Sequence, residues 1–477
     1  MWYLCYFLHR LLDYRLPEVE ALLKLFLKDD PTAGHELRWK QPQHHHPDSP
    51  FYFVNLPSED IARSILSRCF LVKGIYEVWG VGSSYDELRK AIESYPDDRK
   101  APYLTADSTF KVVVDCFGRG LSLQEQTQRI NSLHYIPFQG RVNLKKPQHK
   151  FWLIESDNNV ETNGLPPAMQ KVVLFAREIG MSDRSLLTKY ELSRRKYLGP
   201  TAMDAEIAFL MVNQALVKAG KFVYDPFVGT GSILVAATHF GAITMGEDID
   251  LRVVRDGRGP DCNVWSNFKQ YSLPLPVGLV RADNNSPPWR SSLKEVFDAI
   301  ICDPPYGVRA GGRKSGGRKL LKGSKDPYTI PEDKRKDHIP STAPYMFAEC
   351  VHDLLDIAAR LLVLNGRLVF FYPVARGESY EELYPKHDCF TLIASSEQIL
   401  STRWSRCLLT MEKTAKYTDE HAALALQKHN EFKERHAELL EERDESLHSL
   451  VFAPLANDTG IDYSKQDSRP KYRGKLV

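Results

Sequence analysis

The sequence predicts an α+β region over residues 1–155 and, from about residue 190, an α/β domain built on a mostly parallel sheet. Three observations predict this organisation. The 477 residues are enough for about three domains of ~150 residues each. Strand-like and helix-like segments alternate, and in the second region this alternation favours parallel strands joined by right-handed crossovers. The apolar fraction of 43% and the charged fraction of 26% are typical of globular proteins.

Composition excludes several classes of protein. It does not fit a collagen, a fully disordered chain or a small disulfide scaffold. The net charge is only +2, so any nucleic-acid-binding surface must be local. No apolar stretch approaches the ~20 residues that span a bilayer, and His9, Arg10 and Asp13 interrupt the apolar start, so we expect neither a membrane partner nor a signal peptide. The eight cysteines form no CxxC, which favours a reducing, cytoplasmic location.

The first region alternates strands and helices from its start. A strand near Trp2–Leu8 leads into a helix whose first turn holds Pro17 and Glu18, residue types suited to a helix N-terminus. Prolines mark residues 31–50 as a loop. The following expected elements are a strand at 51–56, a helix after Ser58, a strand at 74–80, a helix at 84–94, a strand at 109–116 and a helix from Ser122.

The remaining chain divides into three parts. We expect a linker at 156–189, the α/β domain at 190–415, and a charged, helical and partly disordered tail at 416–477. The α/β domain begins with a helix at 205–219. Its expected strands lie in the segments KFVYDP, AITMGEDID, VGLVRAD, VFDAIICDPP, GRLVFFYP and RCLLTMEK.

A glycine-containing loop, DPFVGTGS, joins the first of these strands to the next helix. Two glycines let the backbone approach a ligand closely, and the helix N-terminus offers free N–H groups. An ordinary tight turn is the alternative, and the loop lacks the GxGxxG spacing expected for NAD. The candidate cofactor-binding residues here are Asp225, Pro226, Phe227, Gly229, Thr230 and Gly231.

Acidic residues close the next two strands. Asp248 ends the GED turn, where a carboxylate can bind both hydroxyls of a ribose, and Asp250 is a second candidate for that role. Asp283 closes the third strand and is placed to accept from an adenine amine. Since open α/β sheets bind ligands at the carboxyl ends of their strands, these residues predict a nucleoside-containing cofactor.

The fourth strand ends in the candidate catalytic residues Asp303, Pro304, Pro305 and Tyr306. Two prolines stop the strand, so the Asp303 carboxylate and the Pro304 carbonyl are presented as two neighbouring acceptors. A base carrying an exocyclic amine and stacked on Tyr306 is the natural partner. A strand-ending turn with a surface tyrosine is the alternative.

These motifs resemble those of class I S-adenosylmethionine-dependent amino-methyltransferases. The segments RLPE, SEDIARSI, HYIPFQGRVNLKKPQHKF, KYLGPTAMDA and NGRLVFFYP further resemble the catalytic subunit of THUMP-containing tRNA (guanine(10)-N2)-methyltransferases, over roughly residues 1–415. The resemblance implies a THUMP-type tRNA-binding region and a Rossmann-like methyltransferase domain whose last strand is antiparallel. It also implies S-adenosyl-L-methionine as cofactor and a heterodimer with a small zinc-binding activator subunit.

The resemblance implies methylation of the N2 amine of guanosine 10 in tRNA. Acceptors on both N–H groups would favour a pyramidal nitrogen with a localised lone pair, and positioning would supply much of the rate. The base must leave its stack, at a cost partly offset by stacking on Tyr306.

Three basic groups are candidates for RNA binding. For the group at 141–146 a solvated strand edge is the alternative, and for the group at 309–314 the alternative is a solvated insert. The candidates are Arg141, Lys145, Lys146, Arg194, Arg195, Lys196, Arg309, Arg313 and Lys314.

Competing interpretations remain open. The chain could methylate another tRNA guanosine, DNA adenine N6 or a protein amide, or it could be an RNA-binding scaffold without activity. The resemblance to a tRNA-binding region argues against DNA as the substrate. Methylation of a protein amide would be expected to use Asn in place of Asp303. The intact acidic residues argue against a scaffold without activity. No metal site is expected, since the adjacent His44, His45 and His46 cannot easily converge on one ion.

Overall fold

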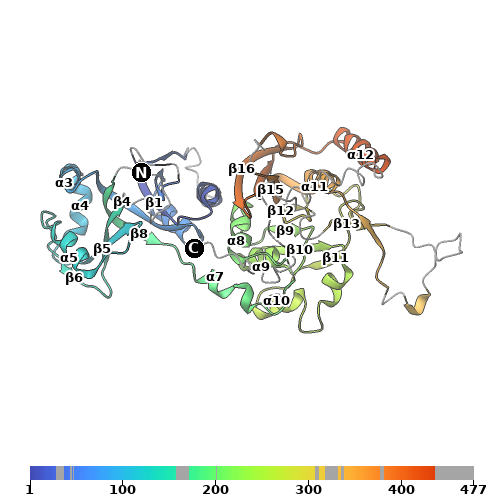
Figure 1. Ribbon diagram of the computed structural model, residues 1–477, viewed down its shortest axis with the longest axis horizontal. Coiled ribbons are helices and arrows are strands. Elements are labelled where there is room, and N and C mark those ends of the chain that lie inside the picture. The colour runs from blue at the N-terminus through green and yellow to red at the C-terminus, as the bar shows by residue number, and fades with distance from the viewer. Residues whose placement is uncertain are drawn as a thin grey trace, which may run out of the picture.

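The structure is a computed structural model that describes residues 1–27, 37–42, 46, 48–156, 171–199, 201–306, 311–316, 331–334, 338–376 and 381–435. Two bodies lie side by side along its long axis, the N-terminal one in blue to cyan and the C-terminal one in green to orange (Figure 1). Within the described residues, no helix has both the length and the apolar character needed to cross a bilayer.

The N-terminal body is built on an eight-stranded sheet in the spatial order β2-β3-β1-β4-β8-β7-β5-β6. Its strands are β1 (Trp2–Phe7), β2 (Trp39–Lys40), β3 (Phe51–Asn55), β4 (Val72–Gly82), β5 (Thr109–Phe117), β6 (Arg141–Val142), β7 (His149–Ser156) and β8 (Val173–Met181). Its helices are η1 (Leu12–Tyr14), α1 (Arg15–Leu27), α2 (Glu59–Leu66), α3 (Tyr85–Ser94), α4 (Asp97–Lys100), η2 (Ala101–Tyr103) and α5 (Leu123–Asn131). Ser58 and Ser122 cap α2 and α5, as their positions predict.

Strand β8 lies inside the segment predicted to be a linker. It pairs antiparallel with both β4 and β7, so the N-terminal sheet extends to Met181. Val173 to Ala176 are all buried, because β8 is an inner strand covered on both faces. Such a strand lacks the alternation of apolar and polar residues that would have identified it. Helices α7 (Ser185–Lys189) and η3 (Leu192–Arg194) follow it.

The C-terminal body has a seven-stranded sheet in the order β11-β10-β9-β12-β15-β17-β16. Its strands are β9 (Phe222–Asp225), β10 (Ile243–Asp248), β11 (Gly278–Arg281), β12 (Phe297–Cys302), β15 (Leu362–Ala375), β16 (Phe390–Ile399) and β17 (Trp404–Lys413). Neighbours from β11 to β15 are parallel, and β17 runs antiparallel to both of its neighbours. The predicted, mostly parallel sheet with an antiparallel last strand is therefore confirmed.

Helices and one hairpin complete this body. The hairpin pairs β13 (Arg313–Ser315) with β14 (Thr342–Pro344). The helices are α8 (Ala205–Gln214), α9 (Ser232–His239), η4 (Arg252–Asp256), α10 (Val264–Gln270), η5 (Glu332–Lys334), α11 (Phe347–Leu361), η6 (Glu381–Leu383) and α12 (Asp419–Glu434). Helix α12 belongs to the predicted charged tail and packs against α11.

The two bodies share one buried apolar cluster, in which α1 packs against α8. The rings of Phe70 and Phe209 lie 5.2 Å apart across this contact. Glu18 is buried there and accepts from the Phe70 amide at 2.8 Å and from Asn213 Nδ2 at 3.0 Å, while burial raises its pKa to about 7. Lys24 adds an ion pair with Glu412 at 2.6 Å. The N-terminal body is thus fixed against the sheet that carries the predicted site.

Candidate active site

The predicted acidic residues meet at one edge of the C-terminal sheet. Strand β9 ends at Asp225 and β10 at Asp248, while Asp303 directly follows β12. These three strands are adjacent and parallel, so their carboxyl ends lie at the same edge. The three aspartates are far apart along the chain, and the sheet topology brings them together.

The loop from Asp225 to Gly231 is shaped by hydrogen bonds to the acidic residues themselves. Asp225 Oδ1 accepts from the Phe227 amide at 3.0 Å, and Asp248 Oδ2 accepts from the Gly229 amide at 3.0 Å. Gly229 and Gly231 have φ angles of 48° and 79°, which favour glycine. A Cβ on Gly231 would also lie 2.9 Å from Val264 Cγ1. The loop therefore needs both glycines in order to hold its close approach to Asp248.

Burial and mutual repulsion raise the pKa of the carboxyl groups at this edge. The pKa of Asp225 is raised mainly by burial and further by Asp248, Asp303 and Glu247. Burial raises the pKa of Asp248 as well. Glu247 lies beneath them with 1% exposure and a pKa of about 8, and its Oε2 accepts from the Tyr224 hydroxyl. A cluster of buried acidic groups with raised pKa values suits a positively charged ligand, because a nearby positive charge favours the ionised carboxylates.

Asp250 and Asp283 make other contacts. Asp250 binds the Arg252 guanidinium through both carboxylate oxygens and turns toward it, and this hydrogen bonding lowers its pKa. Asp283 is buried, and its Oδ1 accepts from the amides of Asn285 and Ser286, both at 3.1 Å. Its Oδ2 accepts from the Ser315 amide at 2.9 Å, which fastens the β13–β14 hairpin beside the predicted cofactor edge. Asp283 holds this edge together, while Asp250 lies outside the cluster.

The DPPY motif contributes Asp303 to the site, as the sequence predicts. Its Oδ2 accepts from Arg406 Nη1 at 3.0 Å, and the same nitrogen lies 3.2 Å from the Tyr306 hydroxyl. Its Oδ1 is buried and accepts no hydrogen bond from the described residues. The Tyr306 ring lies 5.9 Å from Trp404 and 6.4 Å from Phe347, so three aromatic rings lie together beside Asp303. Pro304 is buried and Pro305 half-buried.

Sequence reasoning missed Arg406, Trp404 and Glu247. Arg406 and Trp404 lie on β17, about a hundred residues after Asp303, in a segment whose sequence predicts only a strand. Nothing in their local pattern distinguishes them from other strand residues. Glu247 stands in the GED turn itself, and an acidic residue within an otherwise buried strand was the signal that could have found it.

The basic candidates divide into exposed and buried residues. The exposed ones are Arg141, Lys145, Lys146, Arg194, Lys196 and Arg313. Arg195 is buried and donates to the Ser232 hydroxyl, and Lys314 is buried and paired with Glu349. These two predictions of RNA contact are corrected, since both cations point into the protein. Arg309 lies outside the described residues.

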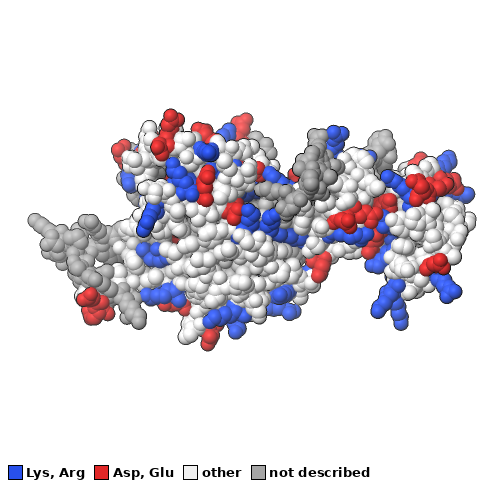
Figure 2. Space-filling view, turned by 180° about the vertical axis from the view of Figure 1, so that it is seen from behind, with Lys and Arg blue, Asp and Glu red and all other residues white. Residues whose placement is uncertain are grey.

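The exposed cations do not form one patch. Strand β6 with Arg141 lies at one end of the molecule, α7 lies between the two bodies, and β13 lies toward the other end (Figure 1). On the opposite face, Lys and Arg side chains are interspersed with Asp and Glu (Figure 2). A nucleic acid would have to touch separate basic groups along the long axis.

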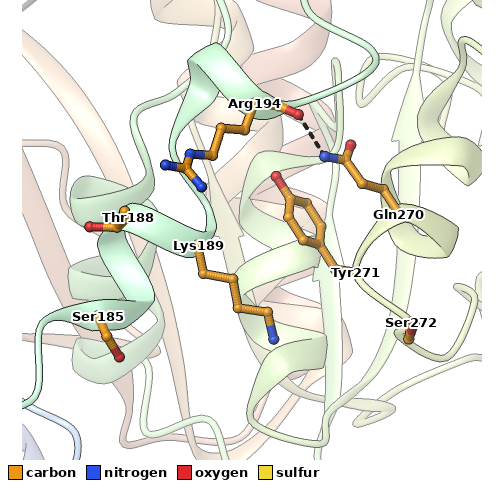
Figure 3. Close-up of a pocket in the computed structure, with 7 residues that line it drawn as sticks. All are labelled: Ser185, Thr188, Lys189, Arg194, Gln270, Tyr271 and Ser272. Carbon is orange, nitrogen blue, oxygen red and sulfur yellow. Dashed lines mark hydrogen bonds between the residues drawn. The ribbon is translucent and has the colours of Figure 1, made fainter.

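An open groove of about 830 Å³ lies between α7 and α10. Figure 3 shows Gln270 Nε2 donating to the Arg194 carbonyl, at 2.6 Å. Two cations, Lys189 and Arg194, line the groove, and no acidic residue does. The lining residues are Ser185, Thr188, Lys189, Arg194, Gln270, Tyr271 and Ser272. This composition suits a phosphate-bearing ligand.

One cluster away from the sheet edge has the residue types of a metal site. Glu349, Asp353 and His429 bring ligand atoms within 4.8 Å of one another. The Lys314 ammonium already contacts Glu349, and Tyr345 donates to Asp353 at 2.7 Å. The cluster is therefore a polar junction of β13, α11 and α12. Of the three adjacent histidines, His44 and His45 lie outside the described residues, and the His46 ring contacts the Asp48 carboxylate at 3.7 Å.

Comparison with known proteins supplies further evidence. The family model for the Tmrp11 THUMP N-terminal domain matches residues 1–184, and that for the RMKL-like methyltransferase domain matches residues 193–323. The Mus musculus protein tRNA (guanine(10)-N(2))-methyltransferase TRMT11 is 39% identical over 448 residues, covering 89% of this chain and 92% of that protein. The Dictyostelium discoideum protein of the same name is 36% identical over 429 residues, covering 87% and 83%. Among solved structures, TrmN from Thermus thermophilus matches with a TM-score of 0.38 and 15% identity, over 86% of this chain and 99% of that one.

Proposed function

The chain belongs to the family of tRNA (guanine(10)-N(2))-methyltransferases, and from that premise we propose that it transfers a methyl group from S-adenosyl-L-methionine to the N2 amine of guanosine 10 in tRNA. The product is N2-methylguanosine, and this chain is the catalytic subunit. The observation that carries the proposal is the position of Asp303, which follows the central strand β12 with one buried carboxylate oxygen unpartnered among the described residues.

The carboxyl edge of the sheet fits the proposed cofactor. S-adenosyl-L-methionine supplies an electrophilic methyl group on a positively charged sulfonium when it is bound. Asp225 and Asp248 have raised pKa values through burial, and a nearby positive charge favours their ionised forms. Both Asp248 oxygens accept from amides, of Gly229 and Asp250, but each keeps a lone pair for a ribose hydroxyl. Asp225 to Gly231 would line the cofactor, with Asp283 at the adenine end.

Asp303 and the Pro304 carbonyl carry the proposed chemistry. Two acceptors on the N–H groups of guanine N2 localise the nitrogen lone pair and make the amine a better nucleophile. Asp303 can then take the proton that the methylated amine releases. Tyr306, with Trp404 and Phe347 beside it, offers the face on which a flipped base stacks.

We propose that tRNA lies across both bodies. The N-terminal body contributes Arg141, Lys145 and Lys146, and the groove contributes Lys189 and Arg194. Lys196 follows the groove, and Arg313 lies on the hairpin fastened to Asp283. A phosphate backbone that follows these cations would run from the N-terminal sheet toward the sheet edge with Asp303.

The proposed activator subunit would pair with a free edge of the C-terminal sheet. The two outer strands are β11 and β16. Strand β16 is partly covered, because Asp13 of η1 accepts from the Glu397 amide at 3.2 Å and Ser396 donates to the Asp13 carbonyl. Beside β11, Leu275 and Val277 are 48% and 68% exposed. Within the described residues the outer edge of β11 has no partner strand, and a strand edge flanked by exposed apolar side chains is a site for strand addition, so β11 is the proposed edge.

All eight cysteines are free thiols, which is usual in a reducing compartment, and we propose that the chain works in the cytoplasm. Fractionation of cells that express the tagged full chain would test this location. Recovery in a secreted or membrane fraction would contradict it.

The reaction is tested by offering the chain, together with the activator, labelled S-adenosyl-L-methionine and separately unmodified tRNA, duplex DNA and protein extract. Digested tRNA should yield N2-methylguanosine, and replacing guanosine 10 should remove it. Label found only in N6-methyladenine or in protein would overturn the proposal. Methylguanosine that survives the loss of guanosine 10 would preserve the chemistry and change the target nucleotide.

A further inference from the structure

Arg406 joins the proposed catalytic carboxylate to the last strand of the sheet. It lies on β17, and its Nη1 donates to Asp303 Oδ2 at 3.0 Å and to the Tyr306 hydroxyl at 3.2 Å. One nitrogen thus contacts the first and last residues of the DPPY motif.

The guanidinium is itself held on its other sides. Arg406 Nε donates to Gln398 Oε1 on β16 at 2.8 Å, and its Cζ lies 3.7 Å from the centre of the Phe371 ring. The side chain is only 13% exposed. A planar cation fixed by a ring face and by directed hydrogen bonds loses little further freedom when it binds a carboxylate.

This arrangement leaves the two oxygens of Asp303 in different states. Oδ2 is bound to Arg406, while Oδ1 is buried and accepts from none of the described residues. An unpaired buried acceptor is costly, and a donor that arrives with the substrate removes the cost. Holding one oxygen therefore prepares the other for an N–H group.

The charges around Asp303 show why a cation is needed there. Burial raises the pKa of Asp303, Arg406 is the main influence that lowers it, and a hydrogen bond with the Tyr306 side chain lowers it further. Asp225 on the neighbouring strand adds negative charge. The titratable groups that face Asp303 are Arg406 on β17, Tyr306 after β12, Asp225 on β9, Tyr14 on η1 and Cys302 on β12. Among these groups, Arg406 is the cation.

We propose that Arg406 is a positioning residue that keeps the Asp303 carboxylate ionised and oriented, with one oxygen left for the substrate amine. This inference rests on the proposed role of Asp303. Arg406 acts through Asp303 and does not itself contact the reacting atoms.

The first test compares Arg406→Gln and Arg406→Lys in the full chain, co-expressed with the activator. We expect Arg406→Gln to lower kcat about tenfold or more, while the KM for tRNA and the affinity for S-adenosyl-L-methionine change little. Without the cation the carboxyl group protonates at higher pH, so the acid limb of the kcat profile should move to higher pH. Arg406→Lys keeps the charge and should restore most of that limb.

The second test separates orientation from charge. Gln398→Leu removes the contact to Nε and keeps the cation, so it should lower kcat modestly without moving the acid limb. An Arg406→Gln variant that loses only thermal stability, with an unchanged pH profile, would overturn the proposal, as would one with raised activity. Asp303→Asn distinguishes failure of the proposed function from failure of this inference, because full activity in that variant would refute the role of Asp303 itself.

Discussion

Asp298 and Asp303 lie at opposite ends of strand β12 and show how surroundings decide what a carboxylate can do. Asp298 pairs with Lys221 at 2.7 Å and accepts from the Phe222 amide at 2.9 Å. Both of its oxygens are used to hold β9 beside β12. Asp303 shares one oxygen with Arg406 and has the other unpartnered among the described residues. The same side chain is structural at one end and available for chemistry at the other.

This contrast supplies a matched pair of variants. Asp303→Asn should lower turnover about 10²-fold or more, since it removes a charge aimed at the transition state. Asp298→Asn, on the same strand, should leave turnover close to that of the unmodified chain. The measurements are methyl transfer to tRNA and calorimetric binding of S-adenosyl-L-methionine, which should stay within a few-fold for both. Equal losses in the two variants would show that only the strand was disturbed.

The two candidates for the ribose contact can be separated in the same way. Asp248 holds the glycine loop and faces the cofactor edge, whereas Asp250 is bound to Arg252. Asp248→Ala should weaken S-adenosyl-L-methionine binding by roughly 1–3 kcal/mol, the scale of a lost charged hydrogen bond. Asp250→Ala should cost less, as measured by calorimetry. The reverse order would assign the ribose to Asp250.

At the scale of elements, the two outer strands of the C-terminal sheet differ in a testable way. Val277→Lys places a charge beside the free edge of β11, where it should block strand addition by the activator. Leu392→Lys places the same charge on β16, which η1 already covers in part, and should leave pairing intact. Co-purification of the tagged chain with the activator measures the difference. Loss of pairing with Leu392→Lys alone would assign the interface to β16.

Elements whose partners are local could be predicted from sequence. The alternation of strands and helices correctly predicted the parallel sheet, and Ser58 and Ser122 marked two helix starts. The antiparallel last strand was implied only by the resemblance to amino-methyltransferases. Strand β8 could not be identified, because both its faces are buried by residues far away in sequence. Arg406 could not be identified for the same reason, since its role depends on a contact with Asp303, 103 residues away in sequence. Lys314 and Arg195 are buried although their charge predicts exposed RNA contacts, because charge alone does not reveal burial.

At the scale of the whole molecule, the two bodies are joined by a common core. Buried residues of α1 and of α8 and α9 belong to one apolar cluster, with Glu18 and Asn213 bonded inside it. A fragment starting near residue 190 would expose this apolar surface to water and be destabilised. The division of labour between tRNA binding and chemistry must therefore be tested in the full chain.

The last prediction uses salt to count phosphate contacts on each body. Replacing Arg141, Lys145 and Lys146 together by Gln should weaken tRNA binding, and so should replacing Lys189 and Arg194 in the groove. Each lost phosphate contact should lower the slope of log Kd against log salt by roughly 0.7–0.9. Turnover at saturating tRNA should change little, because phosphate contacts position the tRNA and take no part in the methyl transfer.

The control removes equal charge elsewhere, by replacing the exposed Lys428 and Lys433 of α12 with Gln. If tRNA is attracted only by overall charge, this control should weaken binding as much as the groove variant does. If tRNA lies across both bodies, the N-terminal and groove variants should each lower the slope, and their combined effect should be close to the sum, because the two groups are well separated. An unchanged slope in the groove variant would restrict tRNA contact to the N-terminal body, and guanosine 10 would then have to reach Asp303 by another path.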